Sequence, residues 1–296
     1  MADESTLAGW TGPSSTTEQD RQDRTERMIR EAVSEHDAFA DCSLRVYTKG
    51  SYPNNTNVRS DSDVDVAVQI TECCYWDEHT PGAHPSTGIY QGVWTPSKLR
   101  FELVAALKAK FPGQVDDTGN IAIRVHSSSA RVDADVIPAF DYRYHFSSSS
   151  FREGSKTFKN SGGSVVNYPD QHLNSGRSKN GRTSNDFKKT VRIFKRIENA
   201  MVEDGYHAEV PSYFVECLVY NCPDTIFACK TWTEVVQGVI VHVWNNLKDD
   251  AEPQDNSLRW LEVNECKYLF GAHQKWTRAD GSNFAKAAWN FLGYAK

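Results

Sequence analysis

The chain has 296 residues, of which 39% are hydrophobic, and its formal net charge is −6 at pH 7. This is enough apolar material for one or two packed cores. No run of about 18 apolar residues occurs, so we expect no membrane span. The acidic start Met1–Glu4 is not followed by an apolar signal region, which predicts a cytoplasmic protein.

Cysteine usage and charge distribution narrow the class of partner. The seven cysteines are odd in number and form no C-x-x-C pair, which favours reduced thiols. Basic side chains are concentrated between Arg177 and Arg196. One local basic patch on an acidic chain favours a small polyanion, such as a nucleoside triphosphate, over long nucleic acid. A solvated helix face is the alternative interpretation of the same patch.

The first half of the chain predicts strands that alternate with helices. Residues 1–14 have no clear pattern and are expected to be disordered, and a helix with a hydroxyl N-cap is expected from Thr16 or Thr17. The remaining expectations, in chain order, are a strand at 43–49, a strand at 64–70, a loop insertion at 71–94, a helix from Pro96 to about 110, paired strands at 121–125 and 132–137, and a flexible Ser/Gly-rich segment at 147–163.

The second half of the chain is predicted to be mostly helical. Helices are expected at 185–203, from Pro211 onward, near 231–248 and near 283–293. The fold class is therefore α+β, with a mixed-sheet lobe at 1–168, which includes the N-terminal helix, and a helical lobe at 169–296.

The most informative motif is Gly50-Ser51, followed after a polar run by Asp63-Val64-Asp65. A Gly-Ser turn can hold phosphate, because Gly allows the backbone to approach a ligand closely. Alternate strand residues face the same side, so both carboxylates share one face about 6.7 Å apart. That spacing suits one or two Mg²⁺ ions that carry nucleotide phosphates.

A third carboxylate is expected on a second strand, which ends at Pro138. Two-metal phosphoryl transfer uses a further acid to hold the metal that activates the attacking hydroxyl. Asp133 and Asp135 have the same parity in this strand, so alternation alone leaves both open.

These residues resemble a known family. Gly50-Ser51, Asp63-x-Asp65 and the phrase from Asp135 to Phe140 are similar to the DNA polymerase β-type nucleotidyltransferases, and more narrowly to the branch of the oligoadenylate synthases, cGAS and the bacterial CD-NTases. Val165–Pro169 and the residues after it resemble the CdnE clade. In that branch the third metal-binding Asp opens the D-V-x-P phrase, which implies Asp135.

The resemblance also implies roles for further residues. It implies two Mg²⁺ ions, with Mn²⁺ as a substitute, on Asp63, Asp65 and Asp135, in a cleft between the two lobes. The other implied nucleotide contacts are phosphate binding by Gly50, Ser51, Lys195 and Ser212, with Arg192 as a further candidate, and base stacking on Tyr213. Asn167 matches a position associated with accepting uracil, since an amide can read one base edge. For Tyr213 a buried interface role, and for Asn167 a turn-capping role, stay open.

The function implied is a cyclic dinucleotide synthase that joins two nucleoside triphosphates (ATP, UTP), with at least one uridine and with cyclic UMP–AMP or a cyclic dipyrimidine as the leading products. The enzyme is expected to act as a monomer in antiphage (CBASS) signalling, where the product activates a separate effector protein. Two alternatives stay open at this point. One is a linear oligonucleotide synthase or a tRNA or protein nucleotidyltransferase, and the other is a non-catalytic nucleotide sensor on the same fold.

Overall fold

The computed structural model describes residues 3–58, 63–85, 90–272 and 274–295, and the chain divides into two compact units. The sheet unit comprises Ser14–Pro53 and Arg59–Pro169, and the helical unit comprises Met1–Pro13, Asn54–Val58 and Asp170–Lys296. The change at 169/170 lies one residue from the predicted lobe boundary. Two short pieces differ from the prediction, because residues 1–13 and 54–58 pack with the helical unit.

The sheet unit contains a seven-stranded mixed sheet with the order β1-β2-β5-β4-β3, to which β6 is added beside β5 and β7 beside β6. Strands β2 and β5 are parallel, and the other pairs are antiparallel. The strands are β1 (Leu44–Lys49), β2 (Val64–Glu78), β3 (Val115–Asp116), β4 (Ile123–Val125), β5 (Ala134–Ser147), β6 (Ser150–Phe158) and β7 (Ser164–Asn167).

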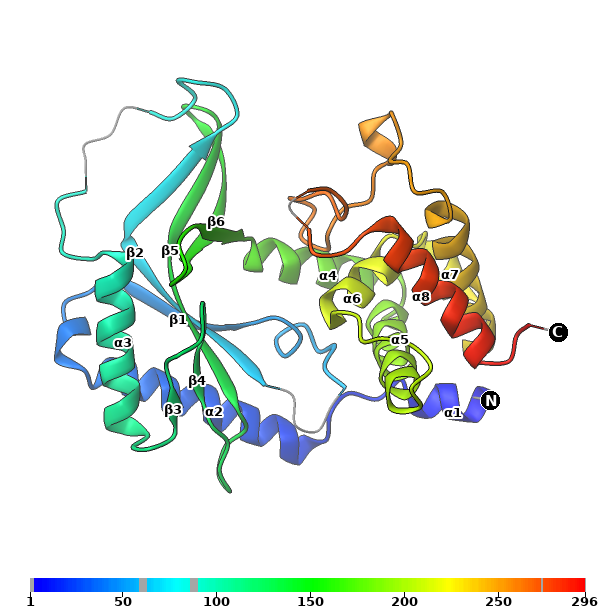
Figure 1. Ribbon diagram of the computed structural model, residues 1–296, viewed down its shortest axis with the longest axis horizontal. Helices are drawn as coiled ribbons and strands as arrows, with labels where there is room; N and C mark the ends of the chain where they lie inside the picture. Colours follow the sequence, from blue (N-terminus) through cyan, green and yellow to red (C-terminus); the bar gives the residue numbers. More distant parts are fainter. Residues whose placement is uncertain (1–2, 59–62, 86–89, 273, 296) are drawn as a thin grey trace. The chain divides into compact units, whose positions relative to one another are not determined.

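Helices α2 (Thr16–Ser34) and α3 (Pro96–Lys110) run alongside this sheet (Figure 1). Ser15 caps α2 by accepting a hydrogen bond from the Glu18 amide, and Thr95 caps α3 with Pro96 in its first turn. The apolar side chains of both helices are buried against alternate residues of β2 and β5, including Val64, Val66, Ala134 and Val136. The opposite residues of these two strands therefore face away from this core.

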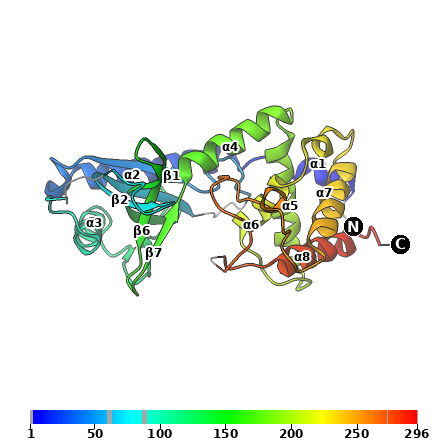
Figure 2. The same ribbon diagram turned by 90° about the horizontal axis from the view of Figure 1, so that it is seen from above.

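The helical unit has its own core, and its helices are seen from a second direction in Figure 2. Its elements are α1 (Glu4–Gly9), α4 (Pro169–Arg182), α5 (Asp186–Glu203), α6 (Ser212–Tyr220), α7 (Trp232–Leu247) and α8 (Arg278–Phe291), and short 3₁₀ turns lie at Asp37–Phe39, Asp224–Ala228 and Asn256–Leu258. Capping boxes at Thr231 and Thr277 start α7 and α8.

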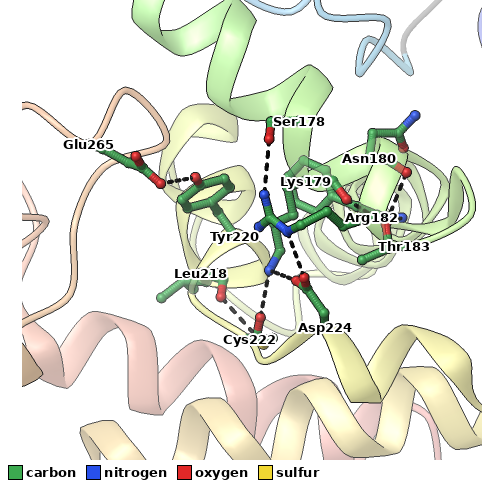
Figure 3. A network of polar contacts seen from close by, with 11 residues as sticks. Ser178, Lys179, Asn180, Arg182, Thr183, Leu218, Tyr220, Cys222, Asp224 and Glu265 are labelled. Atoms are coloured by element: carbon green, nitrogen blue, oxygen red, sulfur yellow. Dashed lines mark hydrogen bonds and ion pairs between the residues drawn. The ribbon is translucent and has the colours of Figure 1, made fainter.

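A buried lysine ties α4 to the segment after α6 (Figure 3). The Lys179 ammonium donates to the Cys222 carbonyl at 2.7 Å and to Asp224 Oδ1 at 2.8 Å. Arg182 donates to the other oxygen of Asp224 at 2.8 Å. The rings of Phe187, Tyr220 and Phe227 lie within 6 Å of the same ammonium. This part of the basic patch therefore serves the fold, because both cations have binding partners inside the unit.

Three expectations about local structure were wrong. Residues 1–14 were expected to be disordered, but α1 buries Leu7 completely, and Glu4 accepts hydrogen bonds from the first amides of α7. The predicted insertion at 71–94 begins inside a strand, since β2 continues to Glu78 after a register shift between Ile70 and Cys74. The segment 147–163 contains β6, in which Ser155 and Thr157 are buried.

The seven cysteines are free, as expected from their number and spacing. Within the part of the chain that the structure describes, no helix is long and apolar enough to span a membrane.

Candidate active site

The aspartates predicted on β2 and β5 lie on the face of the sheet that is turned away from α2 and α3. Val64 and Val66 are buried in the core beside these helices, so Asp65 between them points to the opposite side. On β5 the same argument applies to Asp135, which lies between the buried residues Ala134 and Val136.

Asp65 and Asp135 are direct partners in the parallel ladder of β2 and β5. Adjacent strands lie about 4.8 Å apart, so the two carboxylates start from neighbouring backbone positions. Lys49 on β1 is the partner of Asp65, and Arg124 on β4 is the partner of Asp135. Four adjacent strands therefore carry a row in the order cation, anion, anion, cation, which we call the carboxylate row.

The charges within the carboxylate row perturb one another. Burial raises the pKa of Asp65, and the negative charges of Asp135 and Asp63 raise it further, although Lys49 opposes them. Burial lowers the pKa of Lys49, against the attraction of Asp65 and Asp135. Lys49 thus offsets the cost of burying Asp65 beside two further carboxylates only in part, and such carboxylate oxygens are the ligands that a hard divalent cation prefers. On this observation the residues fit Mg²⁺.

Arg124 also joins Asp63 to Asp133. Its Nη2 lies 3.0 Å from Asp63 Oδ2 and 3.4 Å from Asp133 Oδ2. Asp133 in addition accepts a hydrogen bond of 2.6 Å from the Ser127 amide. Burial alone would raise the pKa of Asp133, but the Ser127 amide and Arg124 hold it below its usual range. These contacts favour a structural role for Asp133, and the strand register favours Asp135 as the third carboxylate, which stays a prediction.

The predicted metal ligands are not gathered into a finished metal centre. Among the residues that the structure describes, no three His, Cys, Asp or Glu side chains form a group that could hold a metal ion. Asp63 is instead ion-paired with Arg124. Binding of two Mg²⁺ ions by Asp63, Asp65 and Asp135 therefore stays a prediction.

The Gly-Ser turn lies at the end of β1, against one of these carboxylates. Gly50 has a φ of +77°, and a Cβ built on it would lie 2.6 Å from Asp65 Oδ2. Only glycine meets both conditions, because other residues are strained at this φ and carry the Cβ that would collide. The turn therefore places Gly50 against the carboxylate row, and phosphate binding by Gly50 and Ser51 stays a prediction.

The residues predicted to bind phosphate from α5 are buried within the helical unit. The Lys195 ammonium lies 3.1 Å from Glu216 Oε2 and 3.2 Å from Thr56 Oγ1. Arg192 donates to the carbonyls of Thr11 at 2.7 Å and Asn55 at 2.5 Å. Both cations thus have partners inside the unit, and phosphate binding by Lys195 or Arg192 stays a prediction.

Ser212 and Tyr213 form the first turn of α6. Ser212 is exposed there, where free helix amides can meet an anion. The Tyr213 hydroxyl donates to Glu262 at 3.2 Å and accepts from Asn264 at 3.2 Å, and its ring packs edge-on against His172. The pKa of Tyr213 is raised above its usual range, chiefly because the residue is buried. These contacts fix the ring within the helical unit, and its stacking on a base stays a prediction.

Asn167 is the last residue of β7, opposite Ser155 of β6. A Cβ on Gly154 would lie 2.7 Å from the Asn167 carbonyl oxygen and 3.0 Å from the Tyr168 ring. Glycine at 154 therefore allows this end of β7 to lie close to β6. The side chain of Asn167 is partly exposed, as a base-reading role requires.

Sequence reasoning missed Lys49 and Arg124 as members of the site, and Thr56 and Glu216 as partners of Lys195. Lys49 directly precedes Gly50, and this adjacency was the available signal for it. The position of Arg124 opposite Asp135 could be found only from the strand register, which the sequence does not show. The contact of Thr56 with Glu216 joins residues 160 apart in sequence and left no local signal.

A mixed sheet with in-register aspartates, together with a helical unit, is the architecture of a two-lobed nucleotidyltransferase. Residues 174–293 match the model of the cGAS/DncV-like nucleotidyltransferase C-terminal helical domain. The chain is 36% identical, over 98% of its length and 97% of the relative's, to a cyclic dipyrimidine nucleotide synthase CdnE of Legionella pneumophila. It is 32% identical, over 98% of both chains, to a cyclic dipurine nucleotide synthase of Elizabethkingia meningoseptica.

The structural comparison agrees with the sequence comparison. The CdnE c-UMP-AMP synthase of Rhodothermus marinus, solved with Apcpp and Upnpp, superposes with a TM-score of 0.85 at 28% identity, over 100% of this chain and 98% of that one. The chain belongs to the CD-NTases, the cGAS/DncV-like nucleotidyltransferases, and within them to the cyclic dinucleotide synthases called CdnE. The predicted family and fold class are confirmed, and the chain is a nucleotidyltransferase.

Proposed function

We propose that this enzyme joins two nucleoside triphosphates, at least one of them UTP, into a cyclic dinucleotide. In each of two steps a ribose hydroxyl attacks the α-phosphorus of a triphosphate, a phosphodiester bond forms, and pyrophosphate leaves. The leading products are cyclic UMP–AMP and a cyclic dipyrimidine. The observation that carries the proposal is the in-register pair Asp65 and Asp135 beside the Gly50-Ser51 turn.

The residues of the sheet unit have distinct roles in this proposal. Asp63, Asp65 and Asp135 would hold two Mg²⁺ ions, or Mn²⁺ in their place, which supply positive charge for the triphosphate and lower the pKa of the attacking hydroxyl. Asp135 also assists removal of the hydroxyl proton. Ser51 and the Gly50 backbone bind the β- and γ-phosphates, since the turn ends beside Asp65. In the helical unit, the free amides of α6 and Ser212 bind phosphate.

Asn167 is proposed as the residue that selects uracil. Two relatives of similar identity to this chain bear names that specify pyrimidine and purine products, so overall identity does not assign the bases. A few side chains at the base edge must therefore decide between them. An amide at the end of β7 offers one donor and one acceptor, which matches the edge of uracil. Tyr213 is proposed to contribute an aromatic face to a base.

The product is proposed to act as a second messenger in antiphage defence, where it activates a separate effector protein. The enzyme is expected to work in the cytoplasm as a monomer, without long nucleic acid as substrate. These expectations follow from its family and from its net charge of −6.

The proposal is tested with purified enzyme, Mg²⁺ and all four ribonucleoside triphosphates, each radiolabelled in turn. We expect a phosphatase-resistant dinucleotide that contains uridine, identified by mass. A purine-only cyclic product would contradict the base assignment and leave the reaction intact. A linear ladder, or no product with either metal, would contradict the cyclase.

A further inference from the structure

A second group of polar side chains lies on the same face of the sheet as the carboxylate row. Gln69 has the same parity as Asp65 in β2, and Asp141 has the same parity as Asp135 in β5. Alternate residues of a strand point to one side, and the neighbouring Phe140 is buried in the core on the other side. All of these residues belong to the sheet unit, so their arrangement is set within one unit.

Two hydrogen bonds join side chains of three strands into a chain. Gln69 Nε2 donates to Asp141 Oδ1 at 2.5 Å, and the Tyr47 hydroxyl on β1 donates to Gln69 Oε1 at 2.6 Å. An ionised carboxylate can only accept, so Gln69 must turn its nitrogen to Asp141 and its oxygen to Tyr47. Gln69 is only 3% exposed. Both ends of this buried amide therefore serve to hold Asp141 in one orientation. We call these three residues the acceptor chain.

The acceptor chain ends in a carboxylate oxygen that can take a further hydrogen bond. Asp141 is partly exposed, and within the part of the chain that the structure describes its Oδ2 accepts no hydrogen bond. Burial raises the pKa of Asp141, whereas the Gln69 amide and the charges of Arg143 and Arg45 oppose this rise, and Glu153 adds to it. A donor placed at Oδ2 would stabilise the charged form. The chemistry of this position therefore fits the N–H group of a ligand.

Asn167 lies at the same level of the sheet as Asp141. Ser155 of β6 is the direct partner of both residues, with Asp141 on its one side and Asn167 on the other. Adjacent strands lie about 4.8 Å apart, so the two backbones are about 10 Å apart and their side chains share one face. The side chain between them is small and is 3% exposed. Two partly exposed polar side chains thus flank a serine that occupies little space.

A carboxylate and an amide differ in the base edge that they can bind. The amide of Asn167 donates and accepts, but an ionised Asp141 only accepts. The pairing edge of uracil has one donor, the N3–H group, between two carbonyl oxygens, and this edge is assigned above to Asn167. A carboxylate directed at the same base would face a carbonyl oxygen, and two opposed acceptors are unfavourable. The amino groups of adenine N6 and cytosine N4, by contrast, are donors.

We propose that Asp141, held by Gln69 and Tyr47, is a second specificity-determining residue, which accepts a hydrogen bond from the exocyclic amino group of the other base while Asn167 binds uracil. The inference rests on the proposed function, because it requires two bases in one site. Adenine and cytosine share the amino group, and the test below distinguishes them. The carboxylate rejects a second uracil, because O4 takes the place of the amino group.

The first test compares Asp141→Asn with the wild type in the presence of all four ribonucleoside triphosphates at equal concentration. We expect the wild type to join uridine to adenosine or to cytidine, and the product mass tells which. Asparagine has the same shape and can turn a donor toward O4, so the share of cyclic di-UMP should rise at least tenfold. A wild type that makes mainly cyclic di-UMP, or a product unchanged by Asp141→Asn, would overturn the proposal.

The second test measures binding without turnover. It uses α,β-methylene triphosphate analogues, which cannot release pyrophosphate, with the uridine analogue present in excess. The base found in the product is compared with the same base without its amino group, which is purine riboside for adenosine and pyrimidin-2-one riboside for cytidine. We expect the wild type to bind the amino base about tenfold to a hundredfold more tightly, and Asp141→Leu to bind both equally. The same preference in Asp141→Leu would overturn the proposal, and Asp141→Asn decides alone should the leucine variant fail to fold.

The matched control is Asp77→Asn. Asp77 accepts a hydrogen bond from the Tyr142 hydroxyl at 2.9 Å, and Tyr142 adjoins Asp141 in β5, so this pair lies on the opposite face of the sheet. The control removes the same charge from the same end of the sheet and should leave the product unchanged. An equal change of product in both variants would show an effect of net charge and overturn the base contact.

Gln69→Leu tests the positioning role of the acceptor chain. It removes the donor that orients Asp141 and retains the carboxylate, so we expect a smaller rise of cyclic di-UMP than with Asp141→Asn, at an unchanged thermal midpoint within a few degrees. Wild-type product composition in Gln69→Leu would refute this role. If the wild-type enzyme makes no cyclic product, the proposed function fails, and the binding comparison with the amino-free analogues still tests Asp141.

Discussion

Replacement of Gly50 by alanine tests the geometry of the Gly-Ser turn. Alanine at a φ of +77° costs about 1–2 kcal/mol of stability, because its Cβ approaches the following carbonyl oxygen. The new Cβ would also lie 2.6 Å from Asp65 Oδ2, while ordinary contact begins near 3.4 Å, so the carboxylate must move by about 0.8 Å (3.4 − 2.6). A displacement of this size at a reacting centre lowers kcat about a hundredfold.

Gly113→Ala is the matched control for this variant. Gly113 has a φ of +72°, and a Cβ built there meets no atom within 4 Å. Both variants therefore carry the same backbone strain, and only Gly50→Ala displaces a carboxylate. We expect both to unfold at temperatures a few degrees lower, and only Gly50→Ala to lose activity, measured as pyrophosphate release. If Gly50→Ala were as active as Gly113→Ala, the close approach of the turn to Asp65 would have no catalytic role.

The remaining predictions concern four acidic or amide side chains. Asp135→Asn should reduce pyrophosphate release at least a thousandfold. Asp133→Asn should reduce it less than tenfold, because Asp133 is bound by Ser127 and Arg124. If Asp133→Asn had the larger effect, the roles of the two residues would be exchanged. Asn167→Ala should lower the share of uridine in the product at least tenfold, measured by mass, and an unchanged share would leave Asn167 as a structural residue. Glu216→Gln should destabilise the protein by about 3–5 kcal/mol at pH 7, because a buried pair is broken. Since the pKa of Glu216 is lowered by folding, its contribution is present above its unfolded value of about 4.3 and is lost as pH falls below it. The difference in denaturant midpoint between the two proteins should therefore narrow in acid, and a difference independent of pH would contradict the charged state.

The sequence predicted those elements whose signals are local. Thr95 and Pro96 start α3 as expected, since a cap and a first-turn proline act within a few residues. The apolar run around Asp65 also predicted a strand, because a strand with one buried face shows it in its own sequence.

Features that depend on tertiary contacts could not be predicted in this way. The strand β6 was interpreted as a flexible segment, because its buried positions include Ser155 and Thr157 and therefore lack an apolar alternation. The end of β2 was missed, because a register shift after Ile70 interrupts the periodicity. The burial of Lys195 depends on Thr56 and Glu216, which are remote from it in sequence.

The division of the chain has a consequence for the order of biosynthesis. The sheet unit is complete once Pro169 has been synthesised, but residues 1–13 and 54–58 belong with the helices that follow. During translation these two pieces remain without their packing partners until α5 and α6 have left the ribosome. The segment Asn54–Val58 can therefore take its native place only after α6 has been synthesised. We expect a chain that terminates before α6 to lack the packing partners of this segment and to be inactive.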